Sequence, residues 1–461
     1  MTLHFYLRYA TRYGQSLFVS GNVDFLGNDD ISKSFPLTYL NDQLWHGSIE
    51  IDSKTIVEPL LYKYILQDEG GDRMPEFGDD RTVDIAKIKA AKMVFTDTWN
   101  HAGNFENVFF TSPFTDVLLK RPVFKKAVQK KSAKSYTHEF RVKAPVLQDD
   151  EIICISGSAA ALYEWDKSNV LLPDKKDNWW TIQVDLSKAE FPLVYKYGVY
   201  NRRSKKFIRF ETGNNRILLN EEAKNTISII HDGFVQLKDI NWKAAGVAIP
   251  VFSLRSKNSF GTGEFADMKL LVDWAKKTGL KMIQLLPVND TTATYTWKDS
   301  YPYAAISAFA LHPLLLNLEA VAGAEHDAVV HSLTVKRKQL NKLPALNYEE
   351  VMMAKTAAIE KLYEFKKDSF KDDMVYISFF ELNRHWLEPY AAFCYLRDKY
   401  KTAEFGKWKS NAVYDESIIQ QLVSPEQKHY DEIAIHYFAQ YHLHLQLMEA
   451  TAYAHKNGII I

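Results

Sequence analysis

The stretch that decides the fold of the C-terminal half is residues 281–318, KMIQLLPVNDTTATYTWKDSYPYAAISAFALHPLLLNL. It begins with Met282–Leu286, a largely apolar run of strand length that Pro287 ends. The loop that follows concentrates polar and aromatic side chains: Asn289, Asp290, Thr291, Thr292, Trp297, Asp299, Tyr301 and Tyr303. Aromatic faces beside short polar groups suit a sugar ring, which has C–H patches on its faces and hydroxyls at its rim. The residues alone leave two interpretations open, a sugar-binding loop and an ordinary surface loop rich in tyrosine.

The residues before this stretch predict a parallel strand–helix–strand unit. Residues 244–251 form an apolar run of strand type. Residues 264–278 then carry apolar side chains at helical spacing, namely Phe265, Met268, Leu271, Val272 and Ala275. Gly279 follows where a left-handed helix cap is expected. A strand, a helix and a strand of this length are typical of an α/β barrel or an open parallel sheet.

Several motifs in this half match a known family. They are the Gly261-x-Gly263-Glu264 turn, Gln284–Pro287, and Pro302-Tyr303 followed by Ser307–Ala310. From about Trp242 onward the chain resembles the amylomaltases, the 4-alpha-glucanotransferases of glycoside hydrolase family 77. The sequence Ser300–Tyr303 (SYPY) and the pair His312-Pro313 resemble the corresponding motifs of plant cytosolic disproportionating enzymes. The resemblance implies the beginning of a TIM-type α/β barrel, incomplete here, with large helical insertions.

Residues 319–457 are almost wholly helical in pattern. The last stretch, residues 430–458, predicts one long helix with a single apolar face, made of Ile433, Tyr437, Tyr441, Leu445, Met448 and Ala452. In the family such helices form subdomains that decorate the barrel. The pattern therefore agrees with the resemblance.

Catalytic carboxylates are not recognisable in this sequence. Glycosyl transfer with retention needs two carboxylates about 5 Å apart, which in an α/β barrel stand at the C-terminal ends of strands. The acids near the two strand ends, Glu264, Asp290 and Asp299, fit a helix N-terminal charge and loop residues better. The resemblance implies that the nucleophile, the acid/base and the His-Asp stabiliser lie beyond Ile461. We therefore name no catalytic residue and expect this chain alone to be inactive.

One substrate-binding residue follows from the resemblance. The Pro-Tyr of this family stacks near the reacting glucose, which implies that Tyr303 belongs to the donor-sugar site. Ser300 and Tyr301 depart from the usual S-P-Y spelling of short amylomaltases. Only Tyr303 is therefore carried over.

The first 230 residues or so predict all-β structure with an internal repeat. Short alternating or β-rich runs lie between Gly, Asn and Asp, a spacing typical of sandwiches. FVSGNVDFLG, Trp45 and LLYKYIL recur as CISGSAAALYEW, Trp179-Trp180 and LVYKYGV at an offset of roughly 135 residues. We predict a first module at 1–121, a linker at 122–135, a second module at 136–235 and a barrel region at 242–461.

Both modules resemble starch-binding modules of carbohydrate-binding family 20. The resemblance implies an α-glucan site in the second module, with Trp165 and Phe210 stacking on sugar and Lys196 in support. In the first module the tryptophan position falls near Asp29, and residues 74–77 replace the second aromatic segment, although Lys63 remains. Without a stacking platform we do not expect ordinary starch affinity there. Trp45 and Trp180 fit core packing better than sugar binding.

Composition excludes several classes of function. The 461 residues predict about three domains, and Lys+Arg and Asp+Glu are both 57, so no basic excess favours nucleic acid or membrane surfaces. Two cysteines, Cys154 and Cys394, argue against a disulfide framework. The N-terminus has no signal-like apolar run, and no stretch of roughly 18 apolar residues occurs. We expect a cytoplasmic protein.

Neither a metal nor a cofactor is predicted. The clustered histidines, His429, His436, His442, His444 and His455, contain no i,i+4 pair of the H-E-x-x-H kind. Gly261-x-Gly263 lacks the third glycine and the Lys-Ser/Thr of nucleotide loops. The expected partners are α-glucans: maltose, maltooligosaccharides, glycogen or starch.

Two classes of function stay open at this level. The first is part of a 4-alpha-glucanotransferase that moves glucosyl or short glucan units between α-1,4-glucans by a retaining double displacement. The alternative is a non-catalytic α-glucan-binding protein that works through its β-modules. A barrel ending on the bare run Ile459–Ile461 argues against the alternative, because natural folds cover or charge such strand edges.

Overall fold

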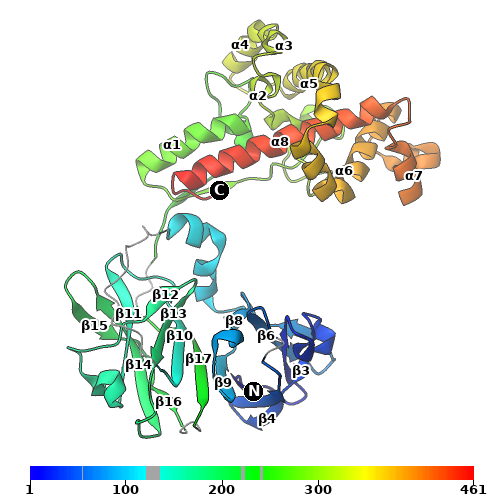
Figure 1. Ribbon diagram of the computed structural model, residues 1–461. Coiled ribbons are helices and arrows are strands. Elements are labelled where there is room, and N and C mark those ends of the chain that lie inside the picture. The colour runs from blue at the N-terminus through cyan, green and yellow to red at the C-terminus, as the bar shows by residue number, and fades with distance from the viewer. Residues whose placement is uncertain (54–55, 121–134, 220–223, 239–241) are drawn as a thin grey trace. The chain divides into compact units, whose positions relative to one another are not determined.

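The computed structural model describes residues 1–53, 56–120, 135–219, 224–238 and 242–461 (Figure 1). Contacts divide the chain into two compact units, Met1–Thr115 with Leu119–Trp242, and Asp116–Leu118 with Lys243–Ile461. The predicted linker at 122–135 lies outside the described residues except for Ser135. The predicted domain limits therefore stay a prediction.

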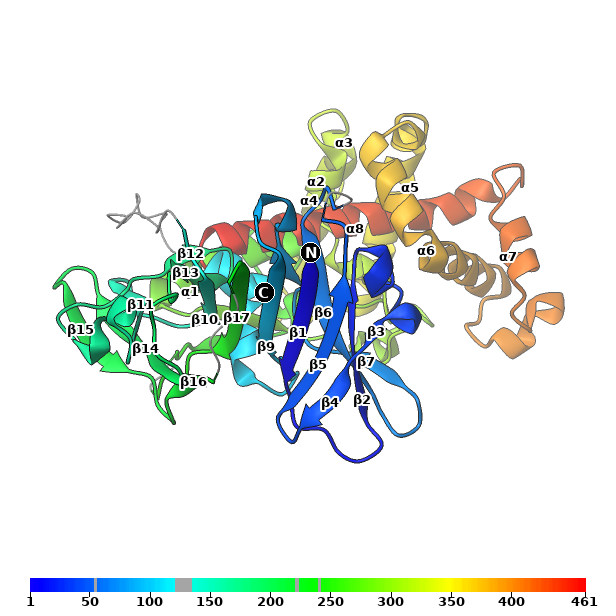
Figure 2. The ribbon, with the colours of Figure 1, turned by 60° about the horizontal axis from the view of Figure 1, so that its bottom comes forward.

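In the first unit one eight-stranded sheet runs through both β-modules (Figure 2). The first module contributes β1 (Thr2–Arg8), β4 (Thr38–Asn41), β5 (Leu44–Glu50) and β9 (Lys92–Thr98). The second contributes β10 (His138–Lys143), β12 (Asp174–Lys176), β13 (Trp179–Val184) and β17 (Thr226–Phe234). The strand order is β12-β13-β10-β17-β9-β1-β5-β4, and the modules join where β9 and β17 pair in parallel.

The two hydrophobic cores lie on opposite faces of this common sheet. Ile229 pairs with Phe95 of β9 and belongs to the core of the first module. Its neighbour Ile230 pairs with Phe140 of β10 and belongs to the core of the second. Successive side chains of a strand point to opposite faces. β17 therefore serves both cores at once, which the repeat in the sequence does not reveal.

Each module completes its sandwich with a second sheet. In the first module this sheet contains β2 (Ser16–Gly21), β3 (Phe35–Pro36), β6 (Leu60–Gln67), β7 (Arg73–Pro75) and β8 (Arg81–Val83). In the second it contains β11 (Glu151–Gly157), β14 (Leu193–Asn201), β15 (Lys206–Phe210) and β16 (Arg216–Leu218). Trp45 and Trp180 are both 7% exposed, which confirms their packing role. The two predicted sandwiches are thus present.

The second unit begins with the predicted strand–helix–strand. β18 (Gly246–Ile249) and β19 (Met282–Leu285) pair in parallel on either side of α1 (Met268–Thr278). Gly279 caps α1 with a φ of 80°. A parallel bridge from Met282 to Ile460 places a third chain segment beside β19. The prediction of parallel strands with a crossover helix is confirmed.

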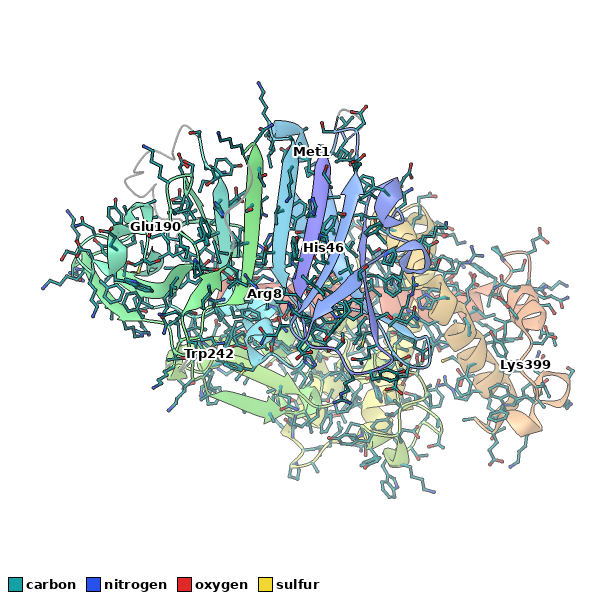
Figure 3. The ribbon with its side chains drawn as sticks, turned by 90° about the horizontal axis from the view of Figure 1, so that it is seen from below. Met1, Arg8, His46, Glu190, Trp242 and Lys399 are labelled. Carbon is teal, nitrogen blue, oxygen red and sulfur yellow. The ribbon has the colours of Figure 1, made fainter. Side chains whose placement is uncertain are left out.

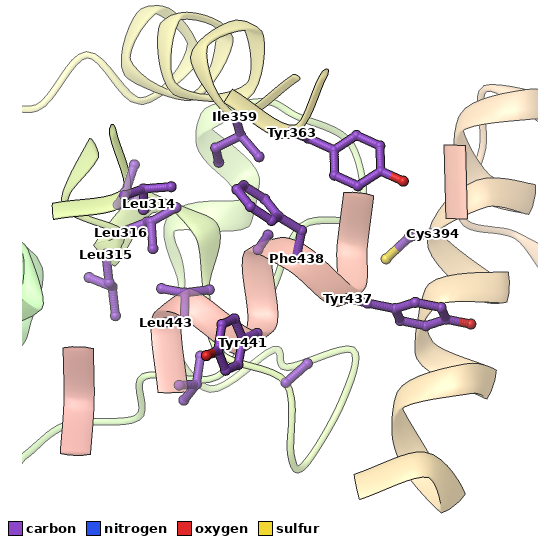
Figure 4. Packing of buried hydrophobic residues seen from close by; sticks show 14 of the residues in the cluster. Leu314, Leu315, Leu316, Ile359, Tyr363, Cys394, Tyr437, Phe438, Tyr441 and Leu443 are labelled. Atoms are coloured by element: carbon purple, nitrogen blue, oxygen red, sulfur yellow. The ribbon is translucent and has the colours of Figure 1, made fainter. Parts of the chain in front are cut away.

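Seven more helices follow in the described residues of this unit: α2 (Leu318–Ala322), α3 (Asp327–His331), α4 (Thr334–Lys342), α5 (Tyr348–Lys371), α6 (Met374–Tyr400), α7 (Glu416–Leu422) and α8 (Tyr430–Lys456). α8 contacts α1, α5 and α6. Figure 4 shows Phe438 and Leu443 of α8 beside Leu314–Leu316 and Ile359, all in one buried cluster. The helical region has its own core.

The prediction of one apolar face along α8 is correct only for the first half of the helix. Ile433, Tyr437 and Tyr441 are buried, but Met448 and Ala452 are exposed. Beyond Tyr441 the buried positions move to Leu443, Gln446, Ala450 and Ala454, because the helix there packs against different neighbours, α1 among them. None of the helices in the described residues is both long and apolar enough to cross a membrane.

Candidate functional site

The structure brings the two predicted sugar-stacking rings of the second module together. Trp165 ends a short helical turn, Ala160–Trp165, in which Tyr163, Glu164 and Trp165 all have positive φ. This strained backbone lifts the indole toward the end of β15, where its ring centroid lies 5.9 Å from that of Phe210, at 79°. Both side chains are half-buried. The pair forms an angled apolar platform, in which the Phe210 ring is also contacted by the ring of Phe207, 4.6 Å away between centroids, and by Nζ of Lys167, 6.0 Å from the Phe210 centroid.

Lys196 holds the segment that follows Phe210. Its Nζ, on β14, donates to the carbonyl oxygen of Gly213 at 2.7 Å. Gly213 has a φ of 76° and leads into Asn214 and Asn215, two side chains that both donate and accept hydrogen bonds. The amine is therefore placed at the turn beside the platform. The assignment of Trp165, Lys196 and Phe210 to sugar binding stays a prediction.

The first module repeats the backbone turn that carries Trp165 in the second module, but it has no tryptophan there. The hydrogen bonds Leu26 N to Val23 O and Asp30 N to Gly27 O repeat as Leu162 N to Ala159 O and Asp166 N to Tyr163 O. Counting along this shared pattern puts Asp29, with a φ of 64°, where the second module has Trp165. Lys63 forms an ion pair with Asp80 at 2.5 Å. The structure thus agrees with the absence of a Trp platform at this turn.

Two exposed tyrosines of the first module were missed by sequence reasoning. Tyr13 is fully exposed, and Tyr39 is 51% exposed with its ring 5.7 Å from that of Trp45. The sequence could have indicated their exposure, because both tyrosines lie in stretches that favour turns, just before Gly14 and Asn41. Exposed aromatic rings of this kind are also suited to sugar faces.

Each module holds one buried aspartate that the sequence did not single out. Asp97 accepts hydrogen bonds from Tyr62 (2.9 Å) and Tyr64 (2.6 Å), and lies 2.5 Å from Nδ1 of His231. Burial opposes ionisation of Asp97, but His231 and Arg81 outweigh it and lower its pKa to about 2. Because His231 belongs to the second module, this contact crosses the junction of the sheet.

The second aspartate repeats this arrangement. Asp232 accepts from the hydroxyls of Tyr195 and Tyr197, both at 2.9 Å, and from Arg8 of the first module at 2.8 Å. Burial again opposes ionisation, yet Arg216 and Arg8 lower the pKa of Asp232 below its usual value. In both modules, therefore, the two hydroxyls of the Tyr-x-Tyr strand motif that marks the repeat donate to one buried carboxylate.

The acids near the barrel strands have structural partners. Glu264 accepts from Nζ of the buried Lys355 at 2.6 Å and begins a capping box with Asp267. Asp290 accepts from the Tyr390 hydroxyl at 2.7 Å. Asp299 accepts from the backbone N–H of Tyr295 at 2.6 Å. These contacts agree with the helix-end and loop roles that the sequence predicted for them.

Tyr303 lies on an aromatic surface of the loop after β19. Its ring is 61% exposed and 5.6 Å from that of Tyr301, and Trp297 on the same loop is 67% exposed. Arg397 of α6 anchors the loop by donating to the carbonyl oxygen of Thr292 at 2.6 Å. The ring is thus open to a ligand, while its role in the donor site stays a prediction. The described residues contain no group of His, Cys, Asp or Glu side chains placed to hold a metal ion.

Comparisons with known proteins give matches to both halves of the chain. Residues 249–461 match the 4-alpha-glucanotransferases of glycoside hydrolase family 77, and residues 1–93 and 137–229 match the starch binding domain of family 20. The 4-alpha-glucanotransferase DPE2 of Oryza sativa subsp. japonica is 33% identical over 484 residues, covering 100% of this chain and 50% of the rice protein. The 4-alpha-glucanotransferase of Chlamydia caviae is 32% identical over 218 residues, 47% of this chain and 39% of its own length. The amylomaltase from Streptococcus agalactiae in complex with acarbose is 20% identical, covers 47% of this chain and 42% of its own, and has a TM-score of 0.37.

The fold and these matches define a class: a multidomain chain in which two β-sandwich starch-binding modules precede an α/β region with helices. Residues 249–461 match the 4-alpha-glucanotransferase domain of glycoside hydrolase family 77, and the β-modules match the starch binding domain of carbohydrate-binding family 20. The chain spans about half the length of the rice relative. The matches do not support the alternative of a non-catalytic protein.

Proposed function

We propose that the protein to which these residues belong is a 4-alpha-glucanotransferase. It transfers glucosyl or short glucan units from an α-1,4-glucan such as maltose to glycogen- or starch-like acceptors, by a retaining double displacement and without a cofactor. The observation that carries this proposal is the match to the rice 4-alpha-glucanotransferase over 100% of the chain, across both modules and the barrel region. The cytoplasmic location stays a prediction.

The β-modules would hold the polymer on which the enzyme acts. The pair of Trp165 and Phe210 offers ring faces to glucose units, and the Lys196 segment offers polar groups beside them. A neutral sugar gains little from long-range charge and depends on such contact surfaces. This supports α-glucans as the partners of the second module.

The described carboxylates near the barrel strands support the expectation that residues 1–461 alone are inactive. Each of Glu264, Asp290 and Asp299 is less than 5% exposed and engaged by the donors described above. A nucleophile must face the anomeric carbon, and a carboxylate buried among its own hydrogen-bond donors does not. We therefore expect residues 1–461 to lack the acid pair of the double displacement.

The test is an activity comparison. Purified 1–461, incubated with maltose and glycogen, should release no glucose above a blank without protein, since neither nucleophile nor proton donor is available. A complete 4-alpha-glucanotransferase that carries this N-terminal sequence should release glucose and lengthen glycogen chains under the same conditions. Reproducible disproportionation by 1–461 would show an acid pair inside this chain, and inactivity of the complete enzyme would contradict the proposed function.

A second prediction concerns the donor site. In the complete enzyme, replacing Tyr303 with alanine should lower kcat/KM for maltose by roughly three- to tenfold, because a stacking ring contributes up to about 1.5 kcal/mol beyond its burial. Tyr414, which is 68% exposed elsewhere in the helical region, provides the matched control: Tyr414→Ala should leave kcat/KM unchanged. A Tyr303→Ala enzyme within twofold of the original would mean that Tyr303 is only structural.

A further inference from the structure

A cleft lies between the two β-modules at one edge of their shared sheet. β1, β9, β17 and β10 are mutually parallel, and their carboxyl ends meet at this edge. Figure 3 shows Arg8, the last residue of β1, at the end of the strand opposite Met1. The cleft has a volume of about 630 Å³, within the range typical of ligand pockets. Both modules line it with rings, namely Tyr9, Phe77 and Trp99 from the first and Trp179 and Phe234 from the second.

Lys143, at the end of β10, is the unusual residue of this cleft. It is 8% exposed, and its Nζ lies 4.8 Å from the ring centroid of Trp179 and 5.3 Å from that of Phe110. Burial lowers its pKa. Within the described residues, its ammonium group makes neither a hydrogen bond nor an ion pair. A second cavity of about 700 Å³ shares Lys143, Trp179 and Asp79 with the cleft, so the ammonium borders open space on both sides.

The other cations of the cleft differ in this respect. Arg81 is paired with Glu76, whereas Arg8 and Arg216 both lie beside Asp232. These ion pairs link groups of the protein itself and belong to the fold. The Lys143 ammonium has three N–H donors and, beyond its contacts with the rings of Phe110 and Trp179, no acceptor within the described residues, so a ligand oxygen in the cleft can accept from it. Lys143 therefore offers a hydrogen-bond donor to a ligand in the cleft.

Two carboxylates in the lining of the cleft narrow the kind of ligand that it can bind. Asp79 is exposed at the rim and Glu106 is half-buried, and their carboxylates accept hydrogen bonds. They would repel an anion that Lys143 alone would attract. A neutral ligand with several hydroxyls can accept from the ammonium through one of them and donate to the carboxylates through others, because each hydroxyl has one donor and two acceptor positions. Hydroxyls around a ring with apolar faces, next to Trp179 and Trp99, describe a sugar.

We propose that the cleft binds a short segment of α-glucan, as a site separate from the Trp165 platform. The choice of α-glucan rests on the proposed function, and the cleft itself rests on Lys143 and its surroundings. Trp165 and Phe210 do not line the cleft. Because the two sites lie on one sheet-linked unit, a glucan long enough to reach both would be held with raised effective concentration.

Hydrogen–deuterium exchange with mass spectrometry tests the site locally, with maltoheptaose as the probe on the whole 1–461 chain. The strand ends 97–101 and 232–236 should gain protection when maltoheptaose is added. This protection should persist in Trp165→Ala, which removes the other platform. The apparent affinity that this protection reports should fall about tenfold in Lys143→Met, which keeps an unbranched side chain one atom shorter and removes the charged donor. Lys188→Met, at an exposed lysine of the same module, should behave like the original.

Asp79→Asn provides a second variant at the exposed rim, where a folding defect is not expected, and should weaken the same protection severalfold. Melting temperatures of all variants show that the fold is intact. Protection confined to the surroundings of Trp165 and Phe210 would overturn the cleft site while leaving glucan binding by the modules in place. Protection in neither place would overturn glucan binding by the modules and the cleft site together.

Discussion

Asp232→Ala should lower the free energy of unfolding of the first unit by about 3–5 kcal/mol, the cost of removing one partner from a buried ion pair. Asp232 is 3% exposed and accepts hydrogen bonds from Arg8, Tyr195 and Tyr197, with Arg216 at 3.5 Å. Without the carboxylate, two guanidinium groups and two hydroxyls lose their common acceptor. Because Arg8 lies in the first module and the tyrosines in the second, both modules should lose stability.

Urea unfolding followed by circular dichroism and tryptophan fluorescence measures this effect. Asp149→Ala is the matched control, since Asp149 is exposed in the same module and its loss should change the free energy of unfolding by about 0.5 kcal/mol or less. A change of less than about 1 kcal/mol for Asp232→Ala would show that this buried network does not hold the modules together.

Trp165→Ala should weaken retention on amylose or β-cyclodextrin gels by about one to two orders of magnitude. A ring that stacks on a ligand contributes about 1–3 kcal/mol in the related case of bases on aromatic platforms. The Trp165 ring is half-buried and meets only Phe210 among the aromatic pairs of the described residues, so its removal should leave the core of the second module intact. The melting temperature should stay close to that of the original.

Affinity electrophoresis with soluble glucan in the gel measures retention directly. Ile208→Ala tests whether any loss of exposed apolar surface has the same effect, because Ile208 is 45% exposed on β15, the strand that carries Phe210. This control should migrate like the original protein. Equal retention of Trp165→Ala and the original would refute the assignment of the platform.

Sequence reasoning succeeded where the pattern is local. The run that Pro287 ends became β19, the spacing before Gly279 became α1, and the repeated segments became two sandwiches. Helical periodicity, proline and glycine act over a few residues, so they can be recognised without knowing the neighbours. The same reasoning failed in the second half of α8, where Met448 is exposed, because neighbouring helices choose which face is covered.

The sequence by itself determined the order of the modules. It also determined that the second module has an aromatic ring, Trp165, at the turn where the first module has Asp29, because these features depend on residue type and on short turns. Only the tertiary structure decided that β9 and β17 pair in parallel and that β17 serves two cores. It also decided that Asp232 meets Arg8 and that Lys143 borders a cleft. Parallel pairing joins residues that lie far apart in the chain. The alternation of apolar and polar residues along one strand fits many possible neighbouring strands, so it specifies neither the partner strand nor the register of pairing.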